Sequence, residues 1–291
     1  MSRTPAVAHT RAELAGLLTP ARRDGSRIGL VPTMGALHEG HAALARVARQ
    51  RVGEGPVVVS VFVNPLQFGP GEDLDRYPRT LETDLEVCAA EGVDVVFAPS
   101  VEDVYPGGEP QVTVDPGPLA DVLEGRTRPG HFRGVLTVVA KLFGLVGPDL
   151  AVFGEKDYQQ LTLVRRMVTD LGHPVEVVGA ETRRDDTGLA LSSRNRYLDE
   201  EARRSAGALA RILRAAAHAA PYGLDAALGS ARAELRQAHG VDLDYLEITA
   251  PDLGPAPAQG PARALIAARV GGTRLIDNLP LVLGSPYEGD S

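Results

Sequence analysis

The chain has 291 residues, of which 44% are hydrophobic and 23% charged, with a formal net charge of −8 and a pI near 5.4. These values are typical of a globular protein and exclude a fibrous or largely disordered one. The acidic balance argues against a protein whose main task is to coat nucleic acid. The single cysteine, Cys88, excludes an intrachain disulfide and a multi-cysteine metal site, so we expect a reducing compartment, by default the cytoplasm.

Neither export nor membrane insertion is expected. The segment Met1–His9 lacks the basic-then-apolar order of a secretory signal. The chain also has no run of about 18 apolar residues, the length needed to cross a bilayer as a helix.

Short apolar runs rich in β-branched residues recur up to residue 178 and predict buried parallel strands. They are Ile28–Val31, Val57–Val63, Val93–Phe97, Leu150–Phe153 and Val175–Val178. Helical spacing of apolar residues falls between them, at Gly40–Val52, Leu81–Ala90, Val135–Val146 and Tyr158–Leu171. The alternation predicts a doubly wound α/β domain over residues 1–182.

The pattern changes after about Ala180. A polar stretch, Arg183–Asn195, precedes alanine- and arginine-rich helical segments that run from Glu200 to about His239. Three expected strands follow, with turns between them at Pro251–Pro261 and Gly271–Gly272. These strands are Leu243–Thr249, Ala264–Val270 and Thr273–Leu279. We therefore predict a domain boundary near Thr182 and a smaller α+β domain over residues 183–291.

Two histidines three residues apart lie where the first strand pattern gives way to a helix, in the segment Val31–His41. A helix start offers unpaired N–H groups and a positive dipole end to phosphate, and glycines allow close approach. Alone, His38 and His41 could equally form a structural turn or bind a metal. No third ligand stands at a recognisable zinc spacing, so the context favours phosphate capture.

Two later polar segments suit the same ligand. Gly154–Asp157 directly follows a predicted strand, which makes Lys156 a candidate phosphate ligand, although Asp157 could simply cap the next helix. Leu191–Asn195 supplies hydroxyls and a guanidinium fitted to triphosphate oxygens. Alternatively, Leu191–Asn195 is only a solvated loop. Because this segment lies at the expected domain junction, it could also act as a mobile lid.

Two more segments allow a structural and a functional interpretation. Asn64 and Gln67 follow a predicted strand and could present amides to a substrate, or Asn64-Pro65 could only make a turn while Gln67 faces water. Pro129–Gly134 could shape a substrate wall or only begin the helix at Val135–Val146.

Seven motifs, in order, closely resemble those of the pantothenate synthetases, the pantoate–β-alanine ligase family of coenzyme A precursor synthesis. They are PTMGALHEGH at Pro32–His41, FVNPLQFGP at Phe62–Pro70, YPRTLE at Tyr77–Glu82, PGHFRGV at Pro129–Val135, FGEKDYQQ at Phe153–Gln160, LSSRNRYL at Leu191–Leu198 and TRLIDN at Thr273–Asn278. Any one of these matches could arise by chance, but seven in order are highly specific.

The resemblance implies a Rossmann-like nucleotidyltransferase domain with a smaller C-terminal domain. It implies a two-step reaction in which ATP activates the carboxylate of (R)-pantoate as an acyl-adenylate, and β-alanine then attacks to give pantothenate and AMP. Diphosphate leaves in the first step. Magnesium is expected with ATP, and a homodimer is expected as the assembly.

The resemblance also assigns site residues. His41 is expected to act as proton donor, supported by His38 and Lys156. The ATP-binding residues it implies are Met34, Gly35, Ala36, Leu37, His38, Glu39, Gly40, His41, Gly154, Glu155, Lys156, Asp157, Arg183, Leu191, Ser192, Ser193 and Arg194. Gln67 and Gln160 match the pantoate ligands, and Gln67 also lies where β-alanine is expected. Asp84 is the candidate carboxylate near magnesium.

One segment departs from the family pattern. Relatives usually read Arg-Glu-x-Asp-Gly-Leu-Ala before the Ser-Ser-Arg loop, whereas Arg184–Ala190 reads RDDTGLA. Asp185 replaces the usual Glu and keeps its charge on a shorter side chain, whereas Thr187 replaces the usual Asp and is uncharged. The motion of this loop or the closure of the domains could therefore differ from that in relatives.

Two other functions are compatible with parts of this sequence. A related nucleotidylyltransferase would transfer AMP to another acceptor, and Gln67 and Gln160 argue against it. A non-catalytic nucleotide-binding protein would have kept the fold alone. Retention of His38, His41, Lys156 and Arg194 argues against that interpretation.

Overall fold

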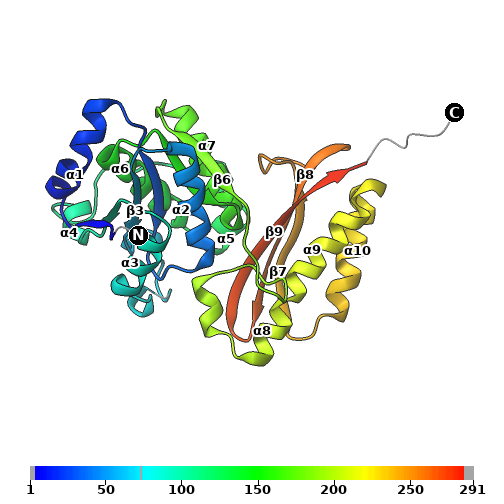
Figure 1. Ribbon diagram of the computed structural model, residues 1–291. Helices are drawn as coiled ribbons and strands as arrows, with labels where there is room; N and C mark the ends of the chain where they lie inside the picture. Colours follow the sequence, from blue (N-terminus) through cyan, green and yellow to red (C-terminus); the bar gives the residue numbers. More distant parts are fainter. Residues whose placement is uncertain (1–3, 73, 285–291) are drawn as a thin grey trace. The chain divides into compact units, whose positions relative to one another are not determined.

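The computed structural model describes residues 4–72 and 74–284, so the expectations for Met1–His9 and for the end of the second domain lie partly outside the described residues. The described residues form two compact units (Figure 1). The first runs to Glu155 and includes residues 159–181, and the second comprises residues 156–158 and those from Thr182 onward. Grouping 156–158 with the second unit is a detail that the sequence did not predict.

Six parallel strands form the sheet of the first unit, in the order β1-β4-β3-β2-β5-β6. They are β1 (Ala6–Ala8), β2 (Gly29–Thr33), β3 (Val57–Val61), β4 (Val95–Phe97), β5 (Leu150–Gly154) and β6 (Glu176–Ala180). The central strands are runs of mainly valine and leucine that are buried, as expected of strands covered by helices. The predicted doubly wound α/β fold is confirmed.

Helices flank this sheet and fill the connections between parallel strands. They are α1 (Arg11–Asp24), α2 (Glu39–Val52), α3 (Leu81–Ala90), α4 (Val101–Val104), α5 (Glu124–Thr127), α6 (His131–Val146) and α7 (Tyr158–Asp170). Helix α2 packs against β2, β3 and β5, whereas α1 packs against α6. Cys88 of α3 lies in the core with α2, and burial, with the nearby charge of Asp84, raises the pKa of its thiol to about 12.

The strand order reverses between β2 and β5, which are hydrogen-bonded neighbours. From β2 the chain proceeds to β3 and β4 on one side, then crosses back to β5 and β6 on the other. In open α/β sheets such a reversal leaves a crevice at the carboxyl ends of the two strands, where ligands bind. The segments that begin at Met34 and Glu155 start from this edge.

The second unit is an antiparallel sheet, in the order β7-β8-β9, covered by helices (Figure 1). Its elements are α8 (Glu200–Ala206), α9 (Ala208–Ala219), α10 (Leu224–Gln237), β7 (Val241–Thr249), β8 (Gly260–Val270) and β9 (Thr273–Leu283). Leu209, Ile212 and Leu213 of α9 share one apolar core with alanines and Ile266 of β8. The smaller α+β domain is thus confirmed as a fold class.

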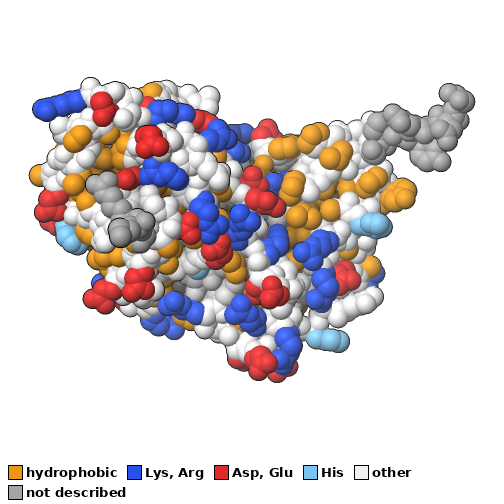
Figure 2. All heavy atoms as spheres, in the orientation of Figure 1, with side chains coloured by type: hydrophobic (Ala, Val, Ile, Leu, Met, Phe, Trp, Pro, Cys, Tyr) orange, Lys and Arg blue, Asp and Glu red, His pale blue; other side chains and the backbone are white. Residues whose placement is uncertain are grey.

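Acidic and basic side chains are interspersed on the face shown in Figure 2. Several charged residues form exposed ion pairs, such as Arg27 with Glu176 at 3.0 Å and Arg204 with Glu200 at 3.0 Å. Such exposed pairs each contribute at most about 1 kcal/mol to folding. Within residues 4–72 and 74–284, none of the helices has both the length and the hydrophobicity of a membrane span.

Candidate active site

Two histidines form the start of α2. The Nδ1 atom of His38, the N-cap residue, accepts a hydrogen bond from the Gly40 amide at 3.1 Å. The Nδ1 atom of His41 accepts one from the His38 amide at 3.3 Å. The two rings lie 4.1 Å apart between centroids. The imidazoles therefore form a reciprocal capping box, a motif usually built from a hydroxyl and a carboxylate.

This capping fixes where each neutral ring carries its hydrogen. A backbone N–H donates to a lone pair, so both Nδ1 atoms are unprotonated and the hydrogens of His38 and His41 are on Nε2. Each Nε2–H is then a hydrogen-bond donor beside a helix N-terminus, which itself favours anions. The arrangement suits phosphate oxygens.

Asp84 of α3 holds the loop that precedes the histidines. Its Oδ1 accepts from the Leu37 amide at 2.8 Å and its Oδ2 from the Ala36 amide at 3.0 Å, and the residue is 1% exposed. Gly35 and Ala36 have φ of 83° and 52°, a conformation that costs energy for Ala36. Asp84 thus stabilises a strained loop, whereas magnesium coordination by Asp84 stays a prediction.

Gln67 lies in a one-turn 3-10 helix, Pro65–Gln67, just after β3. Its Oε1 accepts from Asn64 Nδ2 at 3.1 Å, and its Nε2 lies 3.0 Å from the sulfur of Met34. Asn64 is 1% exposed, and its Oδ1 accepts from the Tyr105 hydroxyl at 2.9 Å. Asn64 therefore makes the turn, as the structural interpretation expects, and its amide orients Gln67.

His131 of the PGHFRGV motif and Arg128, just before that motif, hold the main chain of Gln67. His131 Nδ1 lies 2.9 Å and Arg128 Nη2 lies 3.3 Å from the Gln67 carbonyl oxygen. Arg128 is itself fixed by two bonds to the Glu72 carboxylate, at 2.7 Å and 2.6 Å. Burial raises the pKa of Glu72, but the Arg128 guanidinium more than offsets this, so the pKa lies below its ordinary value.

Helix α6 begins at His131, earlier than the predicted Val135, and Gly134 sets how closely it approaches Gln67. A Cβ atom at Gly134 would lie 2.1 Å from the Leu66 carbonyl oxygen and 2.7 Å from the Gln67 nitrogen. Both are backbone atoms, so a side chain at this position would displace the turn that carries Gln67.

We expect Gly134→Ala to lower the free energy of unfolding by about 1–3 kcal/mol, the usual cost of overpacking. Thermal or denaturant unfolding measures this. Gly144→Ala in the same helix is the matched control, because nothing lies within 4 Å of its added Cβ. The control should be neutral or stabilise by up to about 1 kcal/mol through helix propensity. Equal stabilities for the two variants would contradict the close approach.

Two consecutive glutamines at the start of α7 have different environments. Gln159 is buried, and its Nε2 donates to the carbonyl oxygens of Leu119 at 2.8 Å and Val122 at 2.9 Å. Its Oε1 accepts from the Glu124 amide at 3.0 Å. Gln159 therefore holds the segment before α5. Gln160 is half-buried and remains the candidate ligand of the pair.

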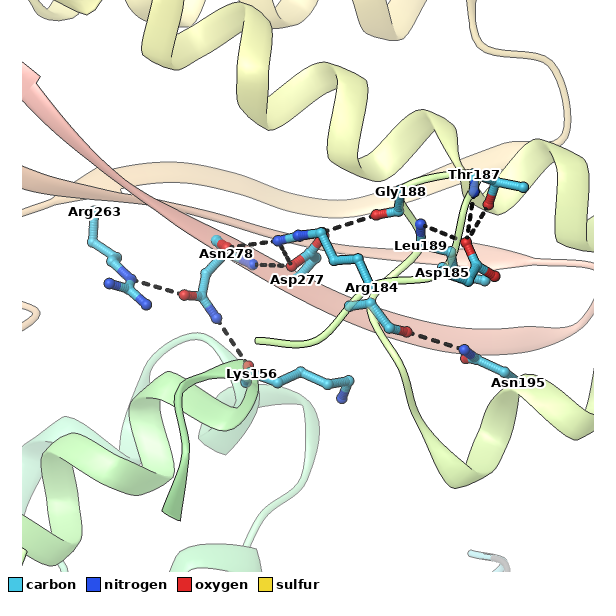
Figure 3. A network of polar contacts seen from close by, with 11 residues as sticks. Lys156, Arg184, Asp185, Thr187, Gly188, Leu189, Asn195, Arg263, Asp277 and Asn278 are labelled. Carbon is cyan, nitrogen blue, oxygen red and sulfur yellow. Dashed lines mark hydrogen bonds and ion pairs between the residues drawn. The ribbon is translucent and has the colours of Figure 1, made fainter. Parts of the chain in front are cut away.

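Lys156 and Asp157 lie in a one-turn 3-10 helix, Glu155–Asp157, between β5 and α7. The Lys156 Nζ lies 3.9 Å from an Asp157 oxygen. Asn278 of β9 donates from Nδ2 to the Lys156 carbonyl oxygen at 2.9 Å (Figure 3). This contact joins the segment to β9 within the second unit.

The Ser-Ser-Arg motif is held by a short hairpin at the start of the second unit. Leu191 donates its amide to the Arg183 carbonyl at 2.8 Å, and Arg184 pairs with Ala190 as an isolated antiparallel bridge. Ser192 caps the next turn by accepting from the Arg194 amide at 3.3 Å. Hydroxyls and guanidinium are thus presented on ordered backbone.

The two positions that depart from the family pattern contact each other. Thr187 donates to Asp185 Oδ1 from its hydroxyl at 2.6 Å and from its amide at 3.0 Å. Arg203 donates to the other Asp185 oxygen at 2.9 Å. Burial raises the pKa of Asp185, but the Thr187 and Arg203 hydrogen bonds outweigh it, so the pKa lies below the ordinary value. The short acid and the hydroxyl together close the hairpin.

Asp185→Asn is expected to destabilise the fold at pH 7 but much less in acid. Because the folded-state pKa is below the unfolded value of about 3.9, the ionised carboxylate stabilises the fold above that pH. This contribution is lost as the pH falls through the folded pKa. Urea unfolding at pH 7 and pH 3 should therefore show a difference from the parent that shrinks in acid. Asp186→Asn, at a neighbouring position, is the control, and a pH-independent difference would contradict the assignment.

Within the part of the chain that the structure describes, no cluster of three or more His, Cys, Asp or Glu side chains could hold a metal ion.

In the first unit, contacts bring Met34 to Gln67, and Ala36 and Leu37 to Asp84. In the second unit, Lys156 and the hairpin that precedes Ser192 both connect to β9. Sequence reasoning missed the residues that hold these groups, Gly134, Gln159 and Asn278, because none carries a local signal for that role.

Known proteins match this chain over nearly its whole length. The family model described as pantoate-beta-alanine ligase matches residues 6–280. A pantothenate synthetase of Nocardioides sp. is 70% identical over 98% of this chain and 88% of its own length.

Solved structures give the same match. The pantothenate synthetase from Thermus thermophilus superposes with a TM-score of 0.87 at 50% identity, covering 94% of this chain and 98% of that one. The pantoate-beta-alanine ligase from Francisella tularensis, complexed with beta-gamma ATP and beta-alanine, superposes with a TM-score of 0.78 at 34% identity, covering 94% and 97%.

Proposed function

This chain belongs to the pantoate–β-alanine ligase family, and from that premise we propose which of its residues carry the formation of pantothenate. ATP, (R)-pantoate and β-alanine are the substrates, and pantoyl-adenylate is the intermediate. The observation that carries the proposal is the start of α2, where two capped imidazoles direct Nε2–H donors beside a helix N-terminus.

In the first step, a pantoate carboxylate oxygen attacks the α-phosphorus of ATP. The new oxygen–phosphorus bond forms as the bond to the β-phosphate oxygen breaks, and diphosphate leaves. Charge grows on the departing oxygens, so hydrogen bonds from His38 and His41 strengthen in the transition state. Lys156, Ser192, Ser193 and Arg194 add donors of the kind that bind phosphate.

In the second step, the β-alanine amine attacks the acyl carbon, the bond from that carbon to the AMP oxygen breaks, and the proton that the amine loses passes to water. AMP is a good leaving group, so the reaction needs no covalent enzyme intermediate, and positioning supplies much of the rate. Gln67 and Gln160 are proposed to orient pantoate, and Gln67 also to orient β-alanine. The fixed amide of Gln67 supports this role, because Asn64 and Met34 hold its two ends.

Experiment can separate this route from its alternatives. Pantoate should drive exchange of diphosphate into ATP without β-alanine, and oxygen-18 from the pantoate carboxylate should appear in AMP. Label found only in inorganic phosphate would indicate an acyl-phosphate route. Absence of both exchange and pantothenate formation at saturating substrates would overturn the proposal. Exchange with a phosphate-bearing acceptor alone would favour another nucleotidylyltransferase.

Magnesium is proposed to accompany ATP, held mainly by phosphate oxygens and water, as this ion usually is. It would neutralise phosphate charge. Asp84 is a poor fit for a direct ligand, because it is 1% exposed and each of its oxygens already accepts a backbone N–H.

The variant Asp84→Asn distinguishes stabilisation of the loop before His38 from coordination of magnesium. The new NH₂ group would face a backbone N–H, so we expect a loss of about 1–3 kcal/mol in unfolding free energy and reduced adenylate formation at any magnesium concentration. If Asp84 instead binds the ion, half-maximal activity will require more magnesium with stability unchanged. Glu82→Gln, at an exposed position of the same helix, is the control.

Two broader properties are also proposed. The family resemblance supports a homodimer, which light scattering of the purified protein would test. The single buried cysteine supports a reducing compartment, the cytoplasm.

A further inference from the structure

The C-terminal sheet fixes the segment that carries Lys156. We propose that Asn278 and Arg263 are positioning residues for Lys156, setting the backbone from which its side chain reaches the nucleotide. The inference rests on the proposed role of Lys156 as a phosphate ligand. It adds two residues, from β9 and β8, to the machinery of the adenylation step.

The first link is the side-chain amide of Asn278, which is 3% exposed. Its Nδ2 donates to the Lys156 carbonyl oxygen at 2.9 Å, and its Oδ1 accepts from Arg263 Nε at 2.8 Å. Figure 3 shows the Lys156 carbonyl facing Asn278 while the Lys156 side chain extends away from it. The amide therefore holds the backbone and leaves the ammonium group to a different partner.

The second link is Arg263, which is also buried. Its guanidinium carbon lies 3.8 Å from the centroid of the Tyr158 ring, a cation–π contact in a desolvated place. The Tyr158 hydroxyl donates to the Pro251 carbonyl at 2.8 Å. Residues on both sides of Asp157 are thus held by the second unit.

Asn278 is itself held by its neighbour in sequence. Asp277 Oδ1 accepts from the Asn278 amide at 2.7 Å and from Arg184 Nη2 at 2.9 Å. Arg184 also donates to the Gly188 carbonyl at 3.1 Å, within the hairpin that leads to Ser192 (Figure 3). Adjacent residues of one strand therefore position two separate phosphate-binding elements, and β9 is the scaffold common to both.

Asn278→Asp tests the proposal, because it keeps the oxygen that faces Arg263 but replaces the donor to Lys156 with a second oxygen. Pantoate-dependent ATP–diphosphate exchange should fall by about 10-fold, since small displacements of a binding group cost this much or more. In a Lys156→Ala background the same change should cost less than about 2-fold, because residues that act through one another are not additive. A role in folding alone would lower exchange by the same factor in both backgrounds.

Tyr158→Phe is the second variant, to be used if Asn278→Asp does not fold. It removes the hydroxyl that bonds Pro251 and keeps the ring under Arg263, so it should give a smaller loss that also disappears in the Lys156→Ala background. Asp244→Asn is the control, since it breaks an ion pair between β7 and Arg274 of β9 and should leave exchange unchanged. Thermal unfolding is recorded for every variant.

The results of these experiments distinguish the positioning role of Asn278 and Arg263 from the phosphate-binding role of Lys156. If Lys156→Ala retains normal exchange, the phosphate role of Lys156 is wrong. If Lys156→Ala impairs exchange but Asn278→Asp does not, or if the two losses simply multiply, the positioning role is overturned while the phosphate role survives.

Discussion

Replacing His41 with asparagine is expected to lower pantoate-dependent adenylate formation by about two orders of magnitude with little loss of stability. Asparagine can place an oxygen where His41 Nδ1 accepts the His38 amide, so the cap survives. It has no donor at the Nε2 position, so the interaction with the departing phosphate is lost. Diphosphate exchange and thermal unfolding measure the two effects separately.

His41→Gln is the complementary variant. Its amide nitrogen can reach the Nε2 position, but the side chain cannot at the same time turn its oxygen to the His38 amide, as glutamine does in an ordinary capping box. We expect partial activity and a loss of at most about 1 kcal/mol from the weakened cap. His41→Ala should show both defects. Near-normal turnover of His41→Asn would exclude a transition-state role for the imidazole.

Lys156→Met should also reduce adenylate formation by about two orders of magnitude, because it keeps the apolar stem and removes the charge that meets the phosphates. The sequence supplies its own control, since Lys141 is the only other lysine. Lys141→Met, in the middle of α6, should retain exchange within about 2-fold, as changes away from a functional site usually do.

The kinetic pattern of Lys156→Met is informative as well. A contact made equally to bound ATP and to the transition state would raise KM alone, whereas one that strengthens during transfer lowers kcat. We expect a loss mainly in kcat. Equal activities for the Lys156 and Lys141 variants would contradict the assignment.

The strands that are most buried could be predicted from the sequence. Strands β2 to β6 are short, mainly apolar runs enclosed by helices, so their pattern is strong. Strand β1, with three residues, is too short to show a period. Helix α1 was not predicted, although Thr10 and Glu13 form a capping box that its sequence displays.

The strands of the second unit extend further than predicted. Strand β9 continues past Leu279 to Leu283 and includes Pro280, which would normally interrupt a strand. It lies at the edge of the sheet, where a missing N–H breaks no ladder, so proline is tolerated. A position at the edge is a property of the tertiary fold and is not visible in one sequence.

The sequence motifs predicted where the candidate site lies, but not which residues hold the site residues in place. Segments such as Pro32–His41 and Phe153–Gln160 stand at strand ends, and strand ends are local signals. Gln159 and Gln160 are chemically identical in sequence, and only packing against Leu119 and Val122 distinguishes them. Likewise Asn278 lies far along the chain from Lys156, so no local pattern could connect them.

The burial of Cys88 makes this protein suitable for site-specific labelling. A thiol with a pKa of about 12, enclosed in the core, is scarcely ionised at neutral pH and out of reach of alkylating dyes. A cysteine introduced by Asp186→Cys, at an exposed position of the hairpin, would then take up the dye alone. Fluorescence from that single probe would follow the hairpin during turnover without first removing the native cysteine.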